Sequence, residues 1–244
     1  MSAPDGERSL ANASALQAHL RGLGTPEAAA IAARYFKTGP GQYGEGDVFL
    51  GIRVPVLRKL AREHRALPTD ELVMLLRSAI HEERLLALLI LVESVSKANE
   101  ATKREVYDLY LAHTAHINNW DLVDSSARDV VGGYLHDKDR SPLYRLARSA
   151  SLWERRIAII ATHHFIARDD FADTLAIAEI LLDDRHDLIH KATGWMLREV
   201  GKRNEPALAR FLRRHAATMP RTMLRYAIER YPADVRKAYL KGEA

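Results

Sequence analysis

The segment Asn118–Asp124 (NNWDLVD) places a tryptophan and a carboxylate four residues apart. In a helix, residues four apart lie on one face, so the side chains of Trp120 and Asp124 point the same way. The apolar spacing that follows predicts one helix over residues 119–135, with both side chains at the edge of its apolar face. Either of the two asparagines at its start can cap this helix. An edge position lets a helix present chemistry to a groove while its core face stays packed.

The same position recurs along the chain at a fixed interval. Arg84, Trp120, Arg156 and Ala192 follow each other at intervals of 36 residues, each near the start of a predicted helix. Each interval holds one further helix, and a two-helix unit of this length is typical of an α-solenoid. Such a stack has a curved inner face lined by one helix of each pair. The repeat register puts four side chains on that class of helix: Trp120, Asp124, Arg156 and Trp195.

The spacing of apolar residues predicts helices in the rest of the chain as well, and no segment alternates between apolar and polar residues over the length of a strand. The glycine-rich residues 38–47 form the longest predicted loop, which we interpret as a surface connection because it lacks the Gly-Lys-Ser/Thr ending of a P-loop. We predict an all-α fold, a right-handed α-solenoid of HEAT-like helix pairs with a concave groove. A single domain is expected over residues 1–244, with residues 1–8 flexible. The predicted helices are 9–21, 26–36, 55–65, 69–78, 81–95, 100–113, 119–135, 142–149, 152–166, 170–183, 187–202, 205–215, 220–230 and 233–240.

Composition limits the possible chemistry. The chain has no cysteine, which excludes disulfides, a thiol nucleophile and a zinc–cysteine site, and fits a reducing cytoplasm. Its first residues lack the apolar core of a signal peptide. The longest aliphatic run, Leu85–Val92, is far too short to span a membrane. We therefore expect a cytoplasmic protein with no membrane partner.

Positive charge is concentrated in the last part of the chain. Residues 141–244 hold 19 Lys and Arg against 13 Asp and Glu, whereas residues 1–140 hold 17 against 19. This excess favours an anionic partner such as nucleic acid. The alternative is that many of these charges lie on solvated outer faces.

Histidine is frequent, with 11 residues, but no complete metal-ligand set is evident. His186 and His190 have the spacing of two zinc ligands on one helix, yet no third ligand accompanies them. His163–His164 and the pair His113 and His116 are similarly incomplete. We predict no metal, and a metal-dependent hydrolase built on His186 and His190 is the weakest alternative.

Four segments, spread from about Tyr43 to the final helices, resemble the AlkD family of DNA alkylation-repair glycosylases, whose members are HEAT-like solenoids. The set is fairly specific in this order and at these intervals. The segments are Phe49–Pro55 (FLGIRVP), Asn119–Asp124 (NWDLVD), Trp153–Arg156 (WERR) and Gly194–Glu199 (GWMLRE).

The resemblance implies that Asp124 is the catalytic carboxylate and that Trp120 and Trp195 contact the deoxyribose of the lesion. One departure is Asn119, which stands where some relatives have a second aromatic residue. This departure bears on the range of substrates more than on the reaction.

The resemblance also implies contacts with DNA. It implies that Arg156 holds the backbone near the lesion and suggests that Tyr43 lines the groove. Arg155 precedes Arg156 directly, and Arg198 lies just beyond Trp195, so we expect both near the DNA. Lys191 is expected to contact phosphate without regard to sequence.

The implied reaction is removal of N3- and N7-alkylated purines, such as 3-methyladenine and 7-methylguanine, from duplex DNA without base flipping. Such a purine is already cationic and leaves as a neutral base, so no general acid is needed. A fixed carboxylate stabilises the oxocarbenium-like sugar, and the electron-rich indole faces attract developing positive charge. We therefore predict a monofunctional alkylpurine DNA glycosylase that acts as a monomer without any cofactor. The alternative is a non-enzymatic HEAT-repeat scaffold that binds DNA or protein.

Overall fold

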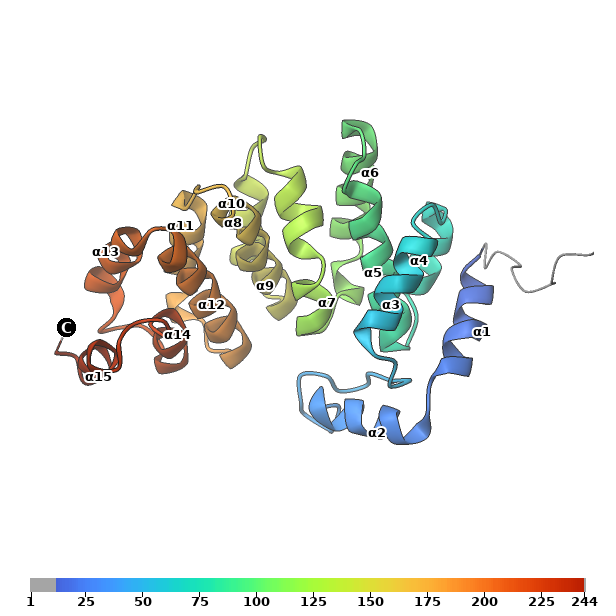
Figure 1. Ribbon diagram of the computed structural model, residues 1–244, viewed down its shortest axis with the longest axis horizontal. Helices are drawn as coiled ribbons and strands as arrows, with labels where there is room; N and C mark the ends of the chain where they lie inside the picture. Colours follow the sequence, from blue (N-terminus) through green and yellow to red (C-terminus); the bar gives the residue numbers. More distant parts are fainter. Residues whose placement is uncertain (1–11, 244) are drawn as a thin grey trace, which may run out of the picture. The chain divides into compact units, whose positions relative to one another are not determined.

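The computed structural model describes residues 12–243, which form the predicted all-α fold of helix pairs (Figure 1). Within these residues the β-type pairing consists of an isolated bridge between Val48 and Ile80. No helix in the described range is both long and apolar enough to cross a membrane. The helices are α1 (Ala13–Leu23), α2 (Pro26–Tyr35), α3 (Val54–Glu63), α4 (Thr69–Leu76), α5 (His81–Val95), α6 (Glu100–Ala112), α7 (Trp120–Asp124), α8 (Ser141–Ala147), α9 (Leu152–Ala161), α10 (His163–Ile166), α11 (Ala172–Ile180), α12 (Asp187–Arg203), α13 (Glu205–His215), α14 (Arg221–Ala227) and α15 (Ala233–Lys241).

Most predicted helices lie within a few residues of the observed ones. Residues 9–11 of the first predicted helix and the segment 1–8 lie outside the described residues. Thr25 caps α2 as predicted, because its hydroxyl accepts from the backbone N–H of Ala28 at 3.2 Å and Pro26 occupies the first turn.

The chain forms two compact units. The first extends up to Thr102 and includes Leu111–Leu122, and the second comprises Lys103–Tyr110 and the chain from Val123 onward. The boundary therefore falls within α6 and within α7. The single domain predicted over residues 1–244 stays a prediction.

Helix α5 is the centre of the first unit. Its apolar run LLALLIL is buried on all sides, and α1, α3 and α4 pack against it. The helix begins with four buried charged or titratable residues, His81, Glu82, Glu83 and Arg84. Buried charges need partners, and these four bind the surrounding loop and helices.

The connection between α2 and α3 spans residues 36–53 and is longer than the predicted loop 38–47. Its last part is fixed by Glu82, whose carboxylate accepts from the backbone N–H groups of Leu50, Gly51 and Ile52 at 2.9, 2.7 and 3.2 Å. Gly51 has φ +80°, and a Cβ there would lie 2.4 Å from the carbonyl carbon of Ala28. The loop is therefore a built part of the first unit and not only a surface connection.

The second unit contains two layers of helices, as the repeat predicts. Helices α9, α12 and α14 contact one another in turn, and α8 and α11 pack against them and against each other. Close approach of α12 to α14 requires Gly194, since a Cβ there would lie 2.4 Å from the Met223 carbonyl oxygen. Arg156 and Ala192, which are one repeat apart, both lie in the α9–α12–α14 layer.

The single helix predicted over residues 119–135 is wrong in its continuity. Helix α7 ends at Asp124, a turn follows, and residues Arg128–Gly132 form a π-helical segment. Ser126 in the turn shares a 2.9 Å hydrogen bond with the buried Tyr110 hydroxyl, a tertiary contact of this turn. Gly132 packs so closely on α9 that a Cβ would lie 2.2 Å from the Ala161 carbonyl oxygen.

The predicted helix 152–166 is also divided, into α9 and α10. Thr162 stands at the junction, and its hydroxyl donates to the Ile159 carbonyl at 2.7 Å. A threonine bond to the preceding turn bends a helix, and period-based prediction does not register it.

Candidate functional site

Helix α7 carries Trp120 at its first position and Asp124 at its last, and both side chains are half-buried. Asn119 directly precedes this helix, and its Oδ1 accepts from the Trp120 backbone N–H at 2.8 Å. A capping side chain accepts from the second or third N–H of a helix, so the asparagine cap stays a prediction.

In the first unit, Trp120 lies in an aromatic cluster. Its indole stacks on Phe36 with ring centroids 5.2 Å apart and planes at 18°, and Tyr35 approaches at 6.0 Å and 71°. Its Nε1–H donates to the hydroxyl oxygen of Tyr43 at 3.2 Å. The structure therefore brings together two of the predicted site residues, Trp120 and Tyr43.

Beneath this cluster lies His81, which is 1% exposed. Its ring stacks on Phe49 at 4.4 Å, and Phe49 stacks on Phe36 at 4.8 Å. Nδ1 of His81 lies 3.1 Å from Asp47 Oδ2, and Nε2 lies 2.8 Å from Asp121 Oδ2. Burial alone disfavours the imidazolium, but the hydrogen bonds to Asp121 and Asp47 raise the pKa of His81 above its ordinary value.

Asp47 joins this histidine to the start of α7. Its Oδ1 accepts from Arg84, and its Oδ2 accepts from Nδ2 of Asn119 at 3.0 Å. Burial opposes ionisation, but the hydrogen bond from His81 and the charge of Arg84 hold the pKa of Asp47 below its usual value. Arg84 also donates to the Ser78 carbonyl at 2.9 Å.

In the second unit, Arg156 forms an ion pair with Asp124. Nε and Nη2 of Arg156 donate to the two carboxylate oxygens of Asp124 at 2.9 and 2.8 Å, and Nη1 donates to the Leu188 carbonyl. The Arg156 side chain is 6% exposed and the Asp124 side chain 17%. A planar guanidinium that donates twice fixes both the position and the plane of a carboxylate.

Trp195, on α12, has other partners in the same unit. Its Nε1–H donates to Glu199 Oε1 at 3.0 Å, and its ring lies edge-on to His163 at 5.9 Å. Burial opposes ionisation of Glu199, but hydrogen bonds from Lys202 and Trp195 hold the pKa of its carboxyl below the usual value. Burial lowers the pKa of His163. Trp195 lies seven residues beyond Leu188, about 10 Å along the helix axis.

The remaining predicted DNA contacts differ in their present partners. Arg155 donates to Asp184 at 2.6 Å and to the carbonyls of Ser149 and Ala150. Arg198 forms ion pairs with Glu199 and Glu229. Lys191 is 41% exposed and pairs with Asp187 one helical turn away at 2.8 Å. The roles of all three in DNA binding stay predictions.

The two histidines considered for a metal site make hydrogen bonds to the backbone. His186 Nδ1 accepts from the Leu188 N–H at 3.2 Å and so caps α12, and His190 Nε2 bonds the Asp184 carbonyl. Within residues 12–243 no group of three or more histidine, aspartate, glutamate or cysteine side chains is placed to hold a metal ion.

Sequence reasoning missed the charged network around His81 and the aromatic side chain of Phe36. A signal existed for the network: His81–Arg84 (HEER) directly precede the aliphatic run Leu85–Val92. Charges next to a buried apolar run must be paired. The identity of the partners, Asp47 and Asp121, is a property of the tertiary structure and has no local pattern.

Comparison with known proteins identifies the family and a similar fold. The family described as "DNA alkylation repair enzyme" matches residues 16–231. A solved structure described as "Predicted DNA alkylation repair enzyme from Enterococcus faecalis" has a similar fold, with a TM-score of 0.65 and 19% identity over 86% of this chain and 97% of that one. No curated protein matches the sequence. The matched family covers most of the chain, which therefore belongs to the DNA alkylation repair enzyme family.

Proposed function

We propose that this protein is a monofunctional DNA glycosylase that hydrolyses the N-glycosidic bond of cationic N3- and N7-alkylated purines in duplex DNA. The observation that carries the proposal is the half-buried carboxylate of Asp124, held at both oxygens by Arg156 and one helical turn from Trp120. Membership of a family of DNA alkylation repair enzymes supports it.

Asp124 is assigned to the sugar. As the glycosidic bond lengthens, positive charge moves from the purine to the deoxyribose, and a carboxylate fixed nearby stabilises that charge. The base leaves as a neutral purine, so no proton needs to be delivered to it. The attacking water can be oriented by the same group.

Arg156 is assigned the role of holding Asp124. The resemblance suggested a contact with the DNA backbone, but in the structure all three of its bonding nitrogens face Asp124 and Leu188. A group that must not move during the reaction benefits from such preorganisation, because a displacement of about 1 Å can cost about a hundredfold in rate. Contact of Arg156 or Arg155 with phosphate stays a prediction.

The two tryptophans are assigned to the deoxyribose. Indole faces attract polarised C–H groups and cations, which suits a sugar that becomes positively charged. Trp120 is oriented by its stack on Phe36 and its bond to Tyr43, and Trp195 by its bond to Glu199. Each ring is therefore held at its nitrogen, which fixes the direction of its faces.

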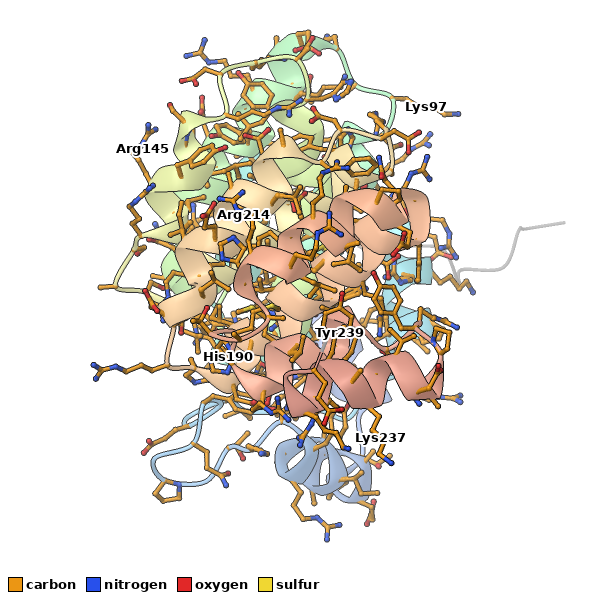
Figure 2. The ribbon with its side chains drawn as sticks, turned by 90° about the vertical axis from the view of Figure 1, so that its left-hand side faces the viewer. Lys97, Arg145, His190, Arg214, Lys237 and Tyr239 are labelled. Carbon is orange, nitrogen blue, oxygen red and sulfur yellow. The ribbon has the colours of Figure 1, made fainter. Side chains whose placement is uncertain are left out.

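Exposed cations are assigned to the phosphates. Arg145 and Lys237 extend away from the ribbon in Figure 2. Lys237 lines a basic depression at α14 and α15, together with the apolar side chains of Ile228 and Leu240. The cations that line it are Arg225, Arg236, Lys237 and Lys241. Such contacts are independent of sequence and sensitive to salt. The concave groove that would receive the duplex stays a prediction, as does action as a monomer.

The experiment is release of methylated bases from duplex DNA treated with a methylating agent, with and without a chelator. We expect 7-methylguanine and 3-methyladenine to appear at the same rate in both conditions, and the abasic strand to stay intact until it is treated with alkali. Release that the chelator abolishes would favour a metal-dependent hydrolase. Salt-dependent binding to the duplex without any release would favour the non-enzymatic scaffold.

A further inference from the structure

The buried histidine of the first unit is connected to Trp120 in two ways. The first is a column of rings in which His81 stacks on Phe49, Phe49 on Phe36 and Phe36 on Trp120, with centroid distances of 4.4, 4.8 and 5.2 Å. The second is polar, because Asp121, which binds His81 Nε2, is the second residue of the helix that Trp120 begins.

Asn119 completes the polar connection. Its Nδ2 donates to Asp47, the other carboxylate bound to His81, and its Oδ1 accepts from the Trp120 backbone N–H. Trp120 therefore lies between the ring column on its side-chain side and the charge network on its backbone side. The stacked rings and the hydrogen bonds through Asp121, Asp47 and Asn119 therefore both connect the protonation state of His81 to the Trp120 indole.

The pairing of His81 requires the charged form of its ring. Each ring nitrogen faces a carboxylate oxygen, at 3.1 and 2.8 Å. A neutral imidazole has one N–H and one lone pair, so one of the two contacts would set a lone pair against a carboxylate. Only the imidazolium donates to both.

We propose that His81, as an imidazolium between Asp47 and Asp121, is a positioning residue that sets the orientation of the Trp120 indole and makes base release depend on its own protonation. This inference rests on the proposed role of Trp120 at the deoxyribose. His81 itself has 1% exposure and does not meet the substrate.

The direction of the pH dependence follows from the groups that face His81. Asp47 approaches from the loop between α2 and α3 and Asp121 from α7, and both favour the cation. Arg84, on α5, donates to Asp47 and neutralises part of its charge. Burial lowers the pKa of His116, and the positive charge of Arg84 is one of the smaller contributions to that lowering. Because the pKa of His81 is raised, the cation persists to higher pH than that of an ordinary histidine and is lost as the pH rises further.

The test is nuclear magnetic resonance of the intact protein labelled with ¹⁵N, titrated from about pH 6 to about pH 10, on both sides of the ordinary histidine pKa. We expect both His81 nitrogens to carry protons below the His81 midpoint, and the Trp120 Nε1–H resonance, assigned with Trp120→Phe, to shift with the same midpoint as His81. A Trp120 resonance that stays constant while His81 titrates overturns the proposal. A His81 pKa at or below the ordinary value also overturns it.

The variant Asp121→Asn separates positioning from simple support of the fold. The amide oxygen still accepts from His81 Nε2, but the charge that favours the imidazolium is gone, so both midpoints should move down by roughly one pH unit or more. Asp108→Asn, on the exposed side of α6 with 61% of its side chain exposed, is the control and should move neither. Midpoints that coincide in wild type and Asp121→Asn contradict the proposal.

Single-turnover release of 7-methylguanine provides the functional arm. We expect the rate to fall by about ten- to a hundredfold above the His81 midpoint, in line with the cost of a misplaced group, and the fall to begin at lower pH in Asp121→Asn. If wild type releases bases but its rate is flat across the His81 transition, the positioning role fails and the glycosylase stands. If no base is released at any pH, the proposed function fails, and the resonance of Trp120 still decides whether His81 orients it.

Discussion

Replacing Arg156 with lysine tests how Asp124 is held. Arg156 makes two hydrogen bonds to Asp124 at 2.9 and 2.8 Å and a third to the Leu188 carbonyl, with only 6% of its side chain exposed. Lysine keeps the charge but cannot form the planar fork. It would lose about two charge-assisted bonds of about 1.5–3 kcal/mol each, partly offset by the retained charge. We expect the free energy of unfolding to fall by about 2–4 kcal/mol in urea denaturation, within the cost of breaking a buried ion pair.

The same variant distinguishes two roles for Arg156. If it holds Asp124, Arg156→Lys should slow single-turnover base release by about a hundredfold while duplex affinity and its salt dependence stay unchanged. If it mainly binds phosphate, lysine should preserve release and any loss should appear in affinity. Arg213→Lys, at an exposed position of α13, provides a matched control. Wild-type stability together with a wild-type rate in Arg156→Lys would refute the assignment.

Three further changes have defined outcomes. Gly194→Ala should lower the free energy of unfolding by about 1–3 kcal/mol through overpacking of α12 on α14. Gly22→Ala on α1, where the added methyl group meets open space, should not lower it. Urea denaturation compares the two variants, and equal effects would contradict the close-packing argument. Burial lowers the pKa of His164 to about 4, so the unfolded chain binds more protons than the folded one between that value and about 6.5. Wild type should therefore lose stability as the pH falls through this window, and His164→Gln should lose less of it, as thermal unfolding at a series of pH values will show. Lys237→Glu should reduce the slope of log affinity against log salt by about one without changing the rate at saturating DNA, and an unchanged slope would remove the basic depression on α14 and α15 from the DNA contacts.

Much of the fold follows from the spacing of apolar residues. The interval of 36 residues predicts the layer in which α9 and α12 lie side by side, and the structure confirms that Arg156 and Ala192 share it. The same reasoning failed at residues 125–132, where the helix breaks and becomes π-helical. Ser126 bonds to Tyr110, and Gly132 lies against the Ala161 carbonyl, so the contacts at this break are tertiary ones. A local period cannot register them.

The candidate site divides in the same way. The residue types and their order pointed to Asp124 and Trp120. The hydrogen-bond partners of these two side chains did not follow from the sequence. That Arg156 grips Asp124 and that Tyr43 bonds Trp120 depends on which elements the fold brings together.

The charges at the start of α5 show the same limit. The residues His81–Arg84 indicate a buried network of charges, because these four charged or titratable residues directly precede a wholly apolar run. The carboxylates that pair with His81 are Asp47 in a loop and Asp121 in α7, which are 34 and 40 residues away. Sequence alone predicts that partners exist and leaves their identity to the structure.

The most direct measurement is single-turnover release of 7-methylguanine from a methylated duplex by Asp124→Asn, compared with wild type at equal occupancy of DNA. The asparagine keeps the size of the side chain and removes the negative charge that is assigned to the developing cation. We predict that the variant folds, binds the duplex with wild-type affinity and loses release by about a hundredfold or more, a loss comparable to that for removing one stabilising group in a preorganised site. Release at the wild-type rate would show that the Asp124 carboxylate does not stabilise the sugar.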